Sequence, residues 1–414
     1  MDFIILIALS VVSALACMNL AKLTKVPAVI FMMLIGVVLG PYVLDLAEGL
    51  EPMAKYSSFA IIALFLVSGY GLNVEAIKAS GKKTFGLSSV PAIGEGLIMG
   101  VVAYLILSVI PVFGSQEILF PAVMVIMLVF AMSSPAIIIP FTMQGKARGM
   151  TFPIFDELTI ASVIDNFIPF PFAIVFLNVA YAIASGEGIN VGSIAFQSIA
   201  IVVAIIVVFI ISYFIGKLSA LLNKVVTNPQ ITAVIVLIIT VVAVLVAGPI
   251  GASLGIIIGL GIGVGYNVST EPQTRMAVLG MSQKIYGLGL MPIVFIYVGT
   301  QIQLDQLLKP TTVIAFTIIT IIGMFIKGFI AKKYLASQGS DPVEGQLAAY
   351  GFAAKGIILI NISLVIGTGL TENGLDYILQ MMYMLAAVSI IISIPYSSVK
   401  LGSHLDVMEE ASKK

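Results

Sequence analysis

Residues 64–77 read LFLVSGYGLNVEAI, and residues 294–307 read VFIYVGTQIQLDQL. The two stretches align without a gap, and a phenylalanine, a glycine and an acidic residue fall at matching positions in both. A second match joins IGVVLG at 35–40 to IGLGIG at 258–263. In each pair one member lies in the first half of the chain and the other in the second half. The chain therefore carries an internal repeat.

The composition around these stretches is that of a membrane protein. Of 414 residues, 60% are hydrophobic and 10% are charged, whereas about a quarter of the residues in a soluble domain are charged. A helix needs about 20 mostly apolar residues to cross a bilayer. We predict an all-α polytopic protein, residues 1–414 forming a single membrane unit, with thirteen transmembrane helices at about 3–21, 27–44, 54–72, 84–110, 118–142, 152–183, 190–216, 229–247, 250–267, 285–300, 310–331, 343–368 and 375–398.

The charged residues in the predicted loops orient these helices. With the N-terminus outside, most of the twenty basic residues fall on the cytoplasmic side, and the outer loops are mainly acidic. Basic residues are enriched in the cytoplasmic loops of membrane proteins. This distribution predicts a multi-pass protein of the cell membrane (plasma or inner) with its N-terminus outside and its C-terminus in the cytoplasm.

The matching stretches lie seven predicted helices apart in both pairs. In the first pair, one stretch leads to the inside of the membrane and the other to the outside. Helices 1–6 and 8–13 are therefore predicted to be inverted repeats, with 190–217 as a connecting helix. Inverted repeats are typical of secondary transporters, whose sites lie near the midplane at interrupted helices.

Four charged residues, Glu95, Asp165, Lys327 and Lys355, fall inside predicted helices. A charge near the bilayer centre costs about 3 kcal/mol or more, so such residues pair with one another or take part in transport. Because the repeat sets helix 4 opposite helix 11, we expect Glu95 and Lys327 to form a structural ion pair. Lys327 is also close enough to Lys332 to reach the inner surface instead. Lys355 is expected to compensate the charge of Asp165.

Helix-breaking residues interrupt two helices that are equivalent in the repeat, 118–142 and 343–368. Proline removes a backbone donor, and freed carbonyls are tolerated in lipid only when they are buried in protein or line a cavity. We predict two broken helices that cross near the midplane, with Lys355 beside their negative C-terminal ends; kinks that serve only packing are the alternative. The residues that carry this prediction are Ser133, Ser134, Pro135, Pro140 and Gly356.

Asp165 and Asn166 lie near the middle of the predicted helix 152–183. A carboxylate beside an amide offers hard oxygen ligands, which suit Na⁺ or Li⁺ and do not suit soft metals. The hydroxyl groups of Ser133 and Ser134 would add oxygen ligands. The sequence therefore predicts a cation and proton site, with Na⁺ bound at Asp165.

These motifs together resemble the cation/proton antiporter superfamily, most closely its NHA-type sodium/proton branch. The resemblance rests on VPAVIFMMLIGVVLGP (26–41), LFLVSGYGLNVEAIKASGKK (64–83), the Pro91-to-Glu95 spacing, Ser134-Pro135-Ala136 and the AAKGIILI stretch around Lys355. Two departures stand out. Ala354 replaces a proline of the family, and the pair Asp165-Asn166 stands where the family's pair usually ends in aspartate.

The resemblance implies a homodimer. Each protomer would have scaffold and dimerisation helices at about 3–72 and 229–300, and a sliding core transport domain at about 84–183 and 310–398. A cation and a proton would compete for the aspartate of the sixth helix. Asp156 and Glu157, at the cytoplasmic start of that helix, would form a funnel or a displaced site, or are simply acids favoured by the helix dipole.

The predicted function is secondary-active antiport of a monovalent cation (Na⁺ or Li⁺, with K⁺ a further candidate) against protons by alternating access, in pH homeostasis. No cofactor, enzyme activity or nucleic-acid partner is expected; the partners are cations, protons and the lipid bilayer. Two alternatives stay open: a sodium-coupled organic-anion symporter with substrate near Lys355, and a non-transporting sensor or channel, allowed by Asn166. An intramembrane aspartyl protease would need two central aspartates, and only Asp165 is central.

Overall fold

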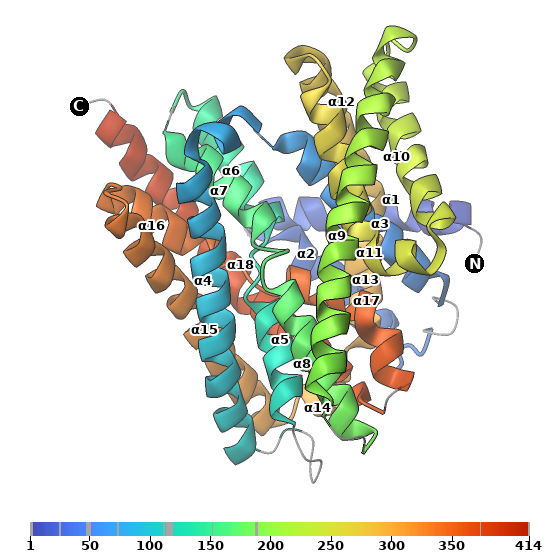
Figure 1. The fold of residues 1–414 in the computed structure, drawn as a ribbon, viewed down its shortest axis with the longest axis vertical. Coiled ribbons are helices and arrows are strands. Elements are labelled where there is room, and N and C mark those ends of the chain that lie inside the picture. Colours follow the sequence, from blue (N-terminus) through green and yellow to red (C-terminus); the bar gives the residue numbers. More distant parts are fainter. Residues whose placement is uncertain are drawn as a thin grey trace. The chain divides into compact units, whose positions relative to one another are not determined.

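The computed structural model describes residues 3–24, 26–46, 51–72, 74–110, 112, 119–150, 152–186, 189–372 and 374–412. Every regular element in these ranges is a helix (Figure 1), which confirms the predicted all-α class. Six of the described helices are long and apolar enough to cross a membrane, and shorter apolar helices accompany them. Helix length alone therefore does not give the predicted count of thirteen.

The chain folds into two compact units. Unit 1 consists of Met1–Leu72, Ile199–Gln301 and Leu364–Ile366, and unit 2 consists of Asn73–Ser198, Ile302–Ser363 and Gly367–Lys414. Each unit draws helices from both halves of the chain, an arrangement that suits two repeats.

Unit 1 holds the helices that carry the repeated glycine motifs. They are α1 (Phe3–Thr24), α2 (Ala28–Leu39), α3 (Glu51–Gly71), most of α9 (Val191–Ser219), the short η2 (Ala220–Lys224), α10 (Pro229–Val246), α11 (Gly248–Val268), α12 (Pro272–Ile285), the π-helical turn η3 (Tyr286–Leu290) and α13 (Met291–Gln301). Residues 268–284 lie between two predicted spans, and α12 fills most of them. Pro272 begins this helix, a position where the missing N–H of proline costs nothing.

Two pairs of helices in unit 1 touch through their backbones at glycines. A Cβ on Gly299 of α13 would lie 2.1 Å from the carbonyl oxygen of Met33 and 2.7 Å from the Cα of Gly36 in α2. A Cβ on Gly69 of α3 would lie 2.8 Å from the Cα of Gly263 in α11. Small residues let helices approach this closely in membranes. The four glycines belong to the repeated motifs. The motif at 35–40 therefore packs against the one at 294–307, and the motif at 64–77 packs against the one at 258–263.

Unit 2 holds the helices that carry the buried charges. They are α4 (Val74–Val109), α5 (Phe120–Phe130), α6 (Pro135–Ala147), α7 (Pro153–Ile164), α8 (Phe170–Ala184), α14 (Leu304–Leu307), α15 (Pro310–Ser337), α16 (Pro342–Gly351), most of α17 (Ile357–Glu372) and α18 (Asp376–Ser412). Several of these helices exceed their predicted spans: α4 begins ten residues before 84, α15 continues past 331, and α18 continues well past 398.

Unit 2 contains both predicted helix breaks. Residues 131–134 separate α5 from α6, and residues 352–356 separate α16 from α17. Pro135 begins α6, Pro140 lies within that helix, and Gly356 has a φ of +98° that L side chains rarely adopt. A third break, at 165–169 between α7 and α8, interrupts the predicted single helix 152–183. Pro169 is the N-cap of α8, and Pro171 lies in the first turn of that helix. The interrupted backbone at these points leaves carbonyls and N–H groups free to bind side chains.

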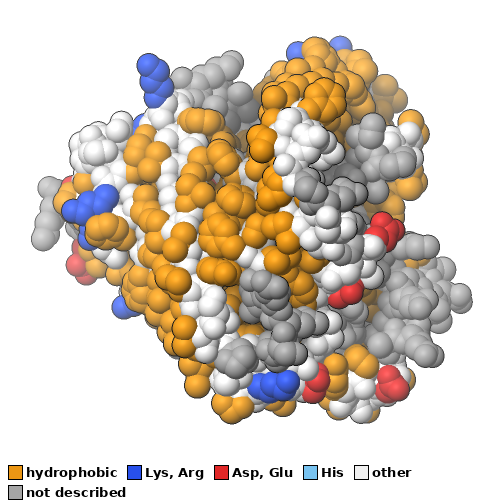
Figure 2. Space-filling view, turned by 60° about the horizontal axis from the view of Figure 1, so that its bottom comes forward, with side chains coloured by type: hydrophobic (Ala, Val, Ile, Leu, Met, Phe, Trp, Pro, Cys, Tyr) orange, Lys and Arg blue, Asp and Glu red, His pale blue; other side chains and the backbone are white. Residues whose placement is uncertain are grey.

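Apolar side chains cover much of the molecule's outside. Figure 2 shows one face on which hydrophobic side chains predominate and charged side chains are few. Along α9, exposed residues include Phe196, Ile199, Val203 and Phe214. Exposed apolar area of this extent is what a lipid bilayer covers, and the protein is therefore a multi-pass membrane protein.

Candidate functional site

Two helices of unit 2 end where the buried charges gather. α5 ends at Phe130 with Ala131 as its C-cap, and α7 ends at Ile164 with Asp165 as its C-cap. The last carbonyls of a helix carry partial negative charge. Asp165 adds a full negative charge at the same place, so the local electrostatics favour a cation strongly.

The cation present is the ammonium group of Lys327, from α15. Its Nζ lies 2.7 Å from Asp165 Oδ2 and 2.6 Å from Ser133 Oγ, and it also donates to the carbonyl oxygen of Ala131. An ammonium group has three donors, so each donor has its own oxygen. The other carboxylate oxygen, Asp165 Oδ1, accepts the backbone N–H of Ser133 at 3.4 Å.

A second ion pair lies beside the first. Lys355, in the break between α16 and α17, has its Nζ 2.5 Å from Glu95 Oε2 of α4 and 3.4 Å from the carbonyl oxygen of Ala131. All four charged side chains are fully buried. The carbonyl of Ala131 thus contacts both lysines, and the four charges form one group with a net charge of zero.

The partners within this group differ from the sequence prediction. The predicted Glu95–Lys327 pair is wrong, because Glu95 pairs with Lys355. The direct partner of Asp165 is Lys327, so any compensation of Asp165 by Lys355 acts without an ion pair between them. Residue counting gave the depth of each charge along its helix but not the direction in which it faces. Glu95 Oε1 faces Gly323, one turn before Lys327 on α15, at 3.1 Å from the position of a Cβ. Lys327 is fully buried, so it does not extend to the surface.

Each of the two lysines also lies near an aromatic ring. Lys327 Nζ lies 4.9 Å from the ring centroid of Phe352, and Lys355 Nζ lies 5.5 Å from that of Phe130. A ring face attracts a cation and offers it no hydrogen bond. Each ring therefore helps to stabilise the positive charge beside it.

Two polar oxygens next to Asp165 are buried without a hydrogen-bond partner among the described residues. They are Asn166 Oδ1 and Ser134 Oγ. The amide nitrogen of Asn166 donates to the carbonyl oxygen of Ser162 at 2.8 Å, which fixes the side chain. A buried acceptor without a partner costs about 1–3 kcal/mol, so these oxygens mark a place where a ligand would be stabilised.

A family model described as the transmembrane sodium/hydrogen exchanger matches residues 7–401. The chain belongs to the sodium/hydrogen exchanger family. This exchanger-family protein also resembles a solved structure, the sodium proton antiporter MjNhaP1 from Methanocaldococcus jannaschii at pH 8, with a TM-score of 0.73 and 15% identity. The likeness covers 96% of this chain and 97% of that one, and it shows the fold. No curated protein matches the sequence. The recognition of a cation/proton antiporter is confirmed at the level of the family.

The two acids predicted to form a cytoplasmic funnel lie in the first turns of α7. Glu157 is buried, and one of its carboxylate oxygens is 2.9 Å from Lys83 Nζ of α4. Asp156 is half-buried and makes an interaction of its own. The role of these two acids as a cytoplasmic funnel for cations in this exchanger-family protein stays a prediction.

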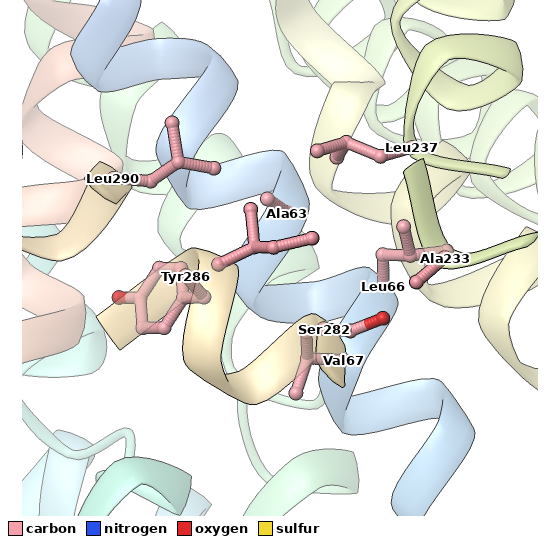
Figure 3. Close-up of a pocket in the computed structure, with 9 residues that line it drawn as sticks. Ala63, Leu66, Val67, Ala233, Leu237, Ser282, Tyr286 and Leu290 are labelled. Carbon is pink, nitrogen blue, oxygen red and sulfur yellow. The ribbon is translucent and has the colours of Figure 1, made fainter. Parts of the chain in front are cut away.

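A pocket in unit 1 has no ion-binding character. Its walls come from α3, α10, α12 and η3 (Figure 3). The lining is apolar except for Ser282 and Tyr286, and it holds no charged side chain. The residues that line it are Ala63, Leu66, Val67, Ala233, Leu237, Ser282, Ile285, Tyr286 and Leu290.

Sequence reasoning missed two residues of the site in unit 2. The Ala131 carbonyl was not named, although Pro135, four residues later, has no N–H to bind it and so indicated a free carbonyl at this position. Ser393 of α18 binds the backbone of Lys355. Its place in a run of serines spaced by four residues was a visible signal in the sequence.

Proposed function

We propose that this exchanger-family protein is a secondary-active antiporter that exchanges Na⁺ or Li⁺, with K⁺ a further candidate, for protons by alternating access. The observation that carries the proposal is that the ammonium of Lys327 occupies an all-oxygen site at Asp165. An ammonium group bound to three oxygens stands where a small monovalent cation would bind.

The cation would take over the oxygens that now bind Lys327. Asp165 would neutralise its charge, and Ser133 Oγ and the Ala131 carbonyl would coordinate it. The unpartnered Asn166 Oδ1 and Ser134 Oγ would complete the shell. Carboxylate, carbonyl and hydroxyl oxygens are hard ligands, which small hard cations prefer.

Charge balance would couple the two ions. A bare carboxylate inside the membrane costs several kcal/mol, so Asp165 needs one positive partner at every stage. When Na⁺ binds the Asp165 carboxylate, the Lys327 ammonium gives its proton to the aqueous phase that the site faces and becomes a neutral amine. When Na⁺ leaves, the amine takes up a proton and binds Asp165 again. One proton therefore moves for each Na⁺.

This balance predicts electroneutral exchange. The site has the same net charge when it holds Na⁺ with a neutral Lys327 as when it holds the Lys327 ammonium alone. Once K⁺ alone is shown to drive no exchange, sodium-driven pH changes in proteoliposomes should therefore be the same at zero potential and at 100 mV set by K⁺ and valinomycin. If one net charge moved per cycle, 100 mV would shift the equilibrium gradient about 50-fold. Such a shift would contradict the one-for-one balance.

A second prediction concerns the amide of Asn166. Asn166→Leu removes the unpartnered oxygen, and a hydrogen bond or ligand contact to a charged group contributes about 1.5–3 kcal/mol. The Na⁺ concentration for half-maximal exchange should therefore rise about tenfold or more, whereas Asn166→Asp, which keeps an oxygen at this position, should not raise it. Asn178→Leu, which changes an amide on α8, is the control. A wild-type Na⁺ dependence in Asn166→Leu would remove this residue from the ligand set.

The symporter alternative has less support. Lys355, near which this alternative places its substrate, is fully buried and already paired with the Glu95 carboxylate, so the carboxylate of an organic anion would have to displace Glu95. A non-transporting sensor or channel would bind Na⁺ without exchanging protons. Exchange by the wild-type protein in proteoliposomes separates these functions from antiport.

We further propose a role for each unit. Unit 2, which holds the site, would be the transport domain, and unit 1, with its glycine-packed helices, would be the scaffold and dimerisation domain of a homodimer. The charge distribution of the loops favours a cell-membrane location with the N-terminus outside.

A further inference from the structure

Three serines on one face of α18 are fully buried. Ser389, Ser393 and Ser397 are spaced by four residues and have 0% exposure, so they lie one above the next along the helix. Each one binds a different element of unit 2: Ser389 Oγ lies 2.9 Å from Thr320 Oγ1 of α15, and Ser397 Oγ donates to the carbonyl oxygen of Tyr350 in α16 at 2.7 Å.

The middle serine binds the backbone of Lys355 itself. Ser393 Oγ accepts the N–H of Lys355 at 2.8 Å and donates to the C=O of Lys355 at 3.2 Å. A hydroxyl has one donor and two acceptor sites, so a single side chain can satisfy both groups. Lys355 stands in the break between α16 and α17, where an uninterrupted helix would have supplied these bonds.

The residue after Lys355 packs against the same helix. Gly356 has a φ of +98°, and a Cβ there would lie 2.9 Å from the carbonyl oxygen of Ala386 and 3.2 Å from the Cβ of Ser389. The break therefore lies directly on the serine face of α18. The position of the break is fixed at Gly356 by close contact with the backbone of α18, and at Lys355 by the Ser393 hydroxyl.

We propose that Ser393 is a positioning residue for cation exchange, acting through Lys355. It holds the backbone of Lys355 so that the ammonium stays on Glu95 and on the Ala131 carbonyl. The same carbonyl binds Lys327, whose replacement by the cation is the exchange step proposed above. When the backbone of Lys355 is released, its ammonium can shift at the shared carbonyl and compete with the cation there. The transport measurements that test this inference rest on the proposed antiport, whereas the hydrogen-exchange measurement does not.

The test compares Ser393→Ala and Ser393→Thr with the wild-type protein, and uses Ser403→Ala as a control. Ser403 lies on the same helix, is exposed, and donates to Val399 O of its own helix. Hydrogen exchange of peptides covering residues 352–358 measures how well the backbone of the break is protected, and this measurement does not depend on transport. In Ser393→Ala, exchange at Lys355 should accelerate about tenfold, as expected for the loss of one net hydrogen bond. Ser393→Thr, which keeps the hydroxyl, should restore protection.

Transport in proteoliposomes gives the second readout. The Na⁺ concentration for half-maximal exchange should rise about tenfold in Ser393→Ala, the pH profile should move, and the maximal rate should change little. Ser393→Thr should return all three toward wild type. If Ser393→Ala does not accumulate, Ser393→Cys, whose thiol is a weak donor and acceptor, should show the same changes at smaller size.

The outcomes separate the two proposals. A wild-type protein that exchanges no Na⁺ for protons overturns the antiport, while hydrogen exchange still tests the positioning role. An active wild-type protein with unchanged protection, Na⁺ dependence and pH profile in Ser393→Ala, or in Ser393→Cys if that variant replaces it, overturns the role of Ser393. A fall in maximal rate alone, without rescue by threonine, also overturns it and assigns Ser393 to packing.

Discussion

Asp165→Asn is expected to lower sodium-driven proton flux by about 100-fold or more. The substitution removes the one negative charge in the oxygen site, and losing one partner of a buried ion pair costs about 3–5 kcal/mol. Na⁺ would then lose its hydration without a counter-charge, and Lys327 would have no carboxylate to return to. The measurement is the internal pH of proteoliposomes after an outward or inward Na⁺ gradient is imposed.

Asp305→Asn is the matched control for this experiment. Asp305 lies in α14 of the same unit, and it is exposed, so its variant should exchange at the wild-type rate. Full sodium-driven flux in Asp165→Asn would contradict the proposed site. Equal loss in both variants would show that the assay reports folding rather than ion binding.

Gly299→Ala is expected to destabilise the protein by about 3 kcal/mol or more, at the upper end of the range for overpacking. The three nearest atoms to the new Cβ all belong to the backbone of α2, and the closest is 2.1 Å away. A backbone cannot swing aside as a flexible side chain does, so α2 and α13 would have to separate along the crossing. Thermal unfolding of the purified protein in detergent measures the effect.

Gly280→Ala, a substitution in the same unit, is expected to raise the stability of the protein. Gly280 lies inside α12, and a Cβ there meets nothing within 4 Å. Alanine restricts the unfolded chain more than glycine does, so this variant should gain about 0.5–1 kcal/mol. Similar unfolding temperatures for Gly299→Ala and the wild-type protein would show that the close approach of α2 and α13 does not limit stability.

The sequence predicted the features of the fold that depend on composition and periodicity. Long apolar runs require helices, and the two breaks follow from Pro135 and from Lys355-Gly356, residues that a continuous lipid-exposed helix would not contain. The third break lies within 152–183, which was predicted as one helix although it contains Pro169 and Pro171. The helix α12 was also not predicted, since it is less apolar than a membrane span and falls between two predicted spans.

The candidate site was predicted in its members but not in its pairing. Glu95, Asp165, Lys327 and Lys355 could be found because any charge within an apolar span stands out. The pairing of acids and lysines depends on how the helices are rotated and on how far each lysine side chain extends. Neither can be predicted from a single sequence. The Ala131 carbonyl has no side-chain signal of its own, and the clue to it was Pro135, which lacks the N–H that would bind this carbonyl in a continuous helix.

The bond between Lys327 and Asp165 has a consequence for how the protein would respond to its surroundings. The ammonium is attached to the same chain as the site, so it competes at an effective concentration set by geometry, commonly in the millimolar range or above. In the proposed exchange, sodium in solution would have to displace this tethered competitor, and the ammonium would give up its proton as it leaves. Occupancy would therefore follow the ratio of sodium activity to proton activity, rather than the sodium level alone. A cell that is low in sodium or acidic would keep the site filled by its own lysine, and the exchanger would then rest without draining either gradient.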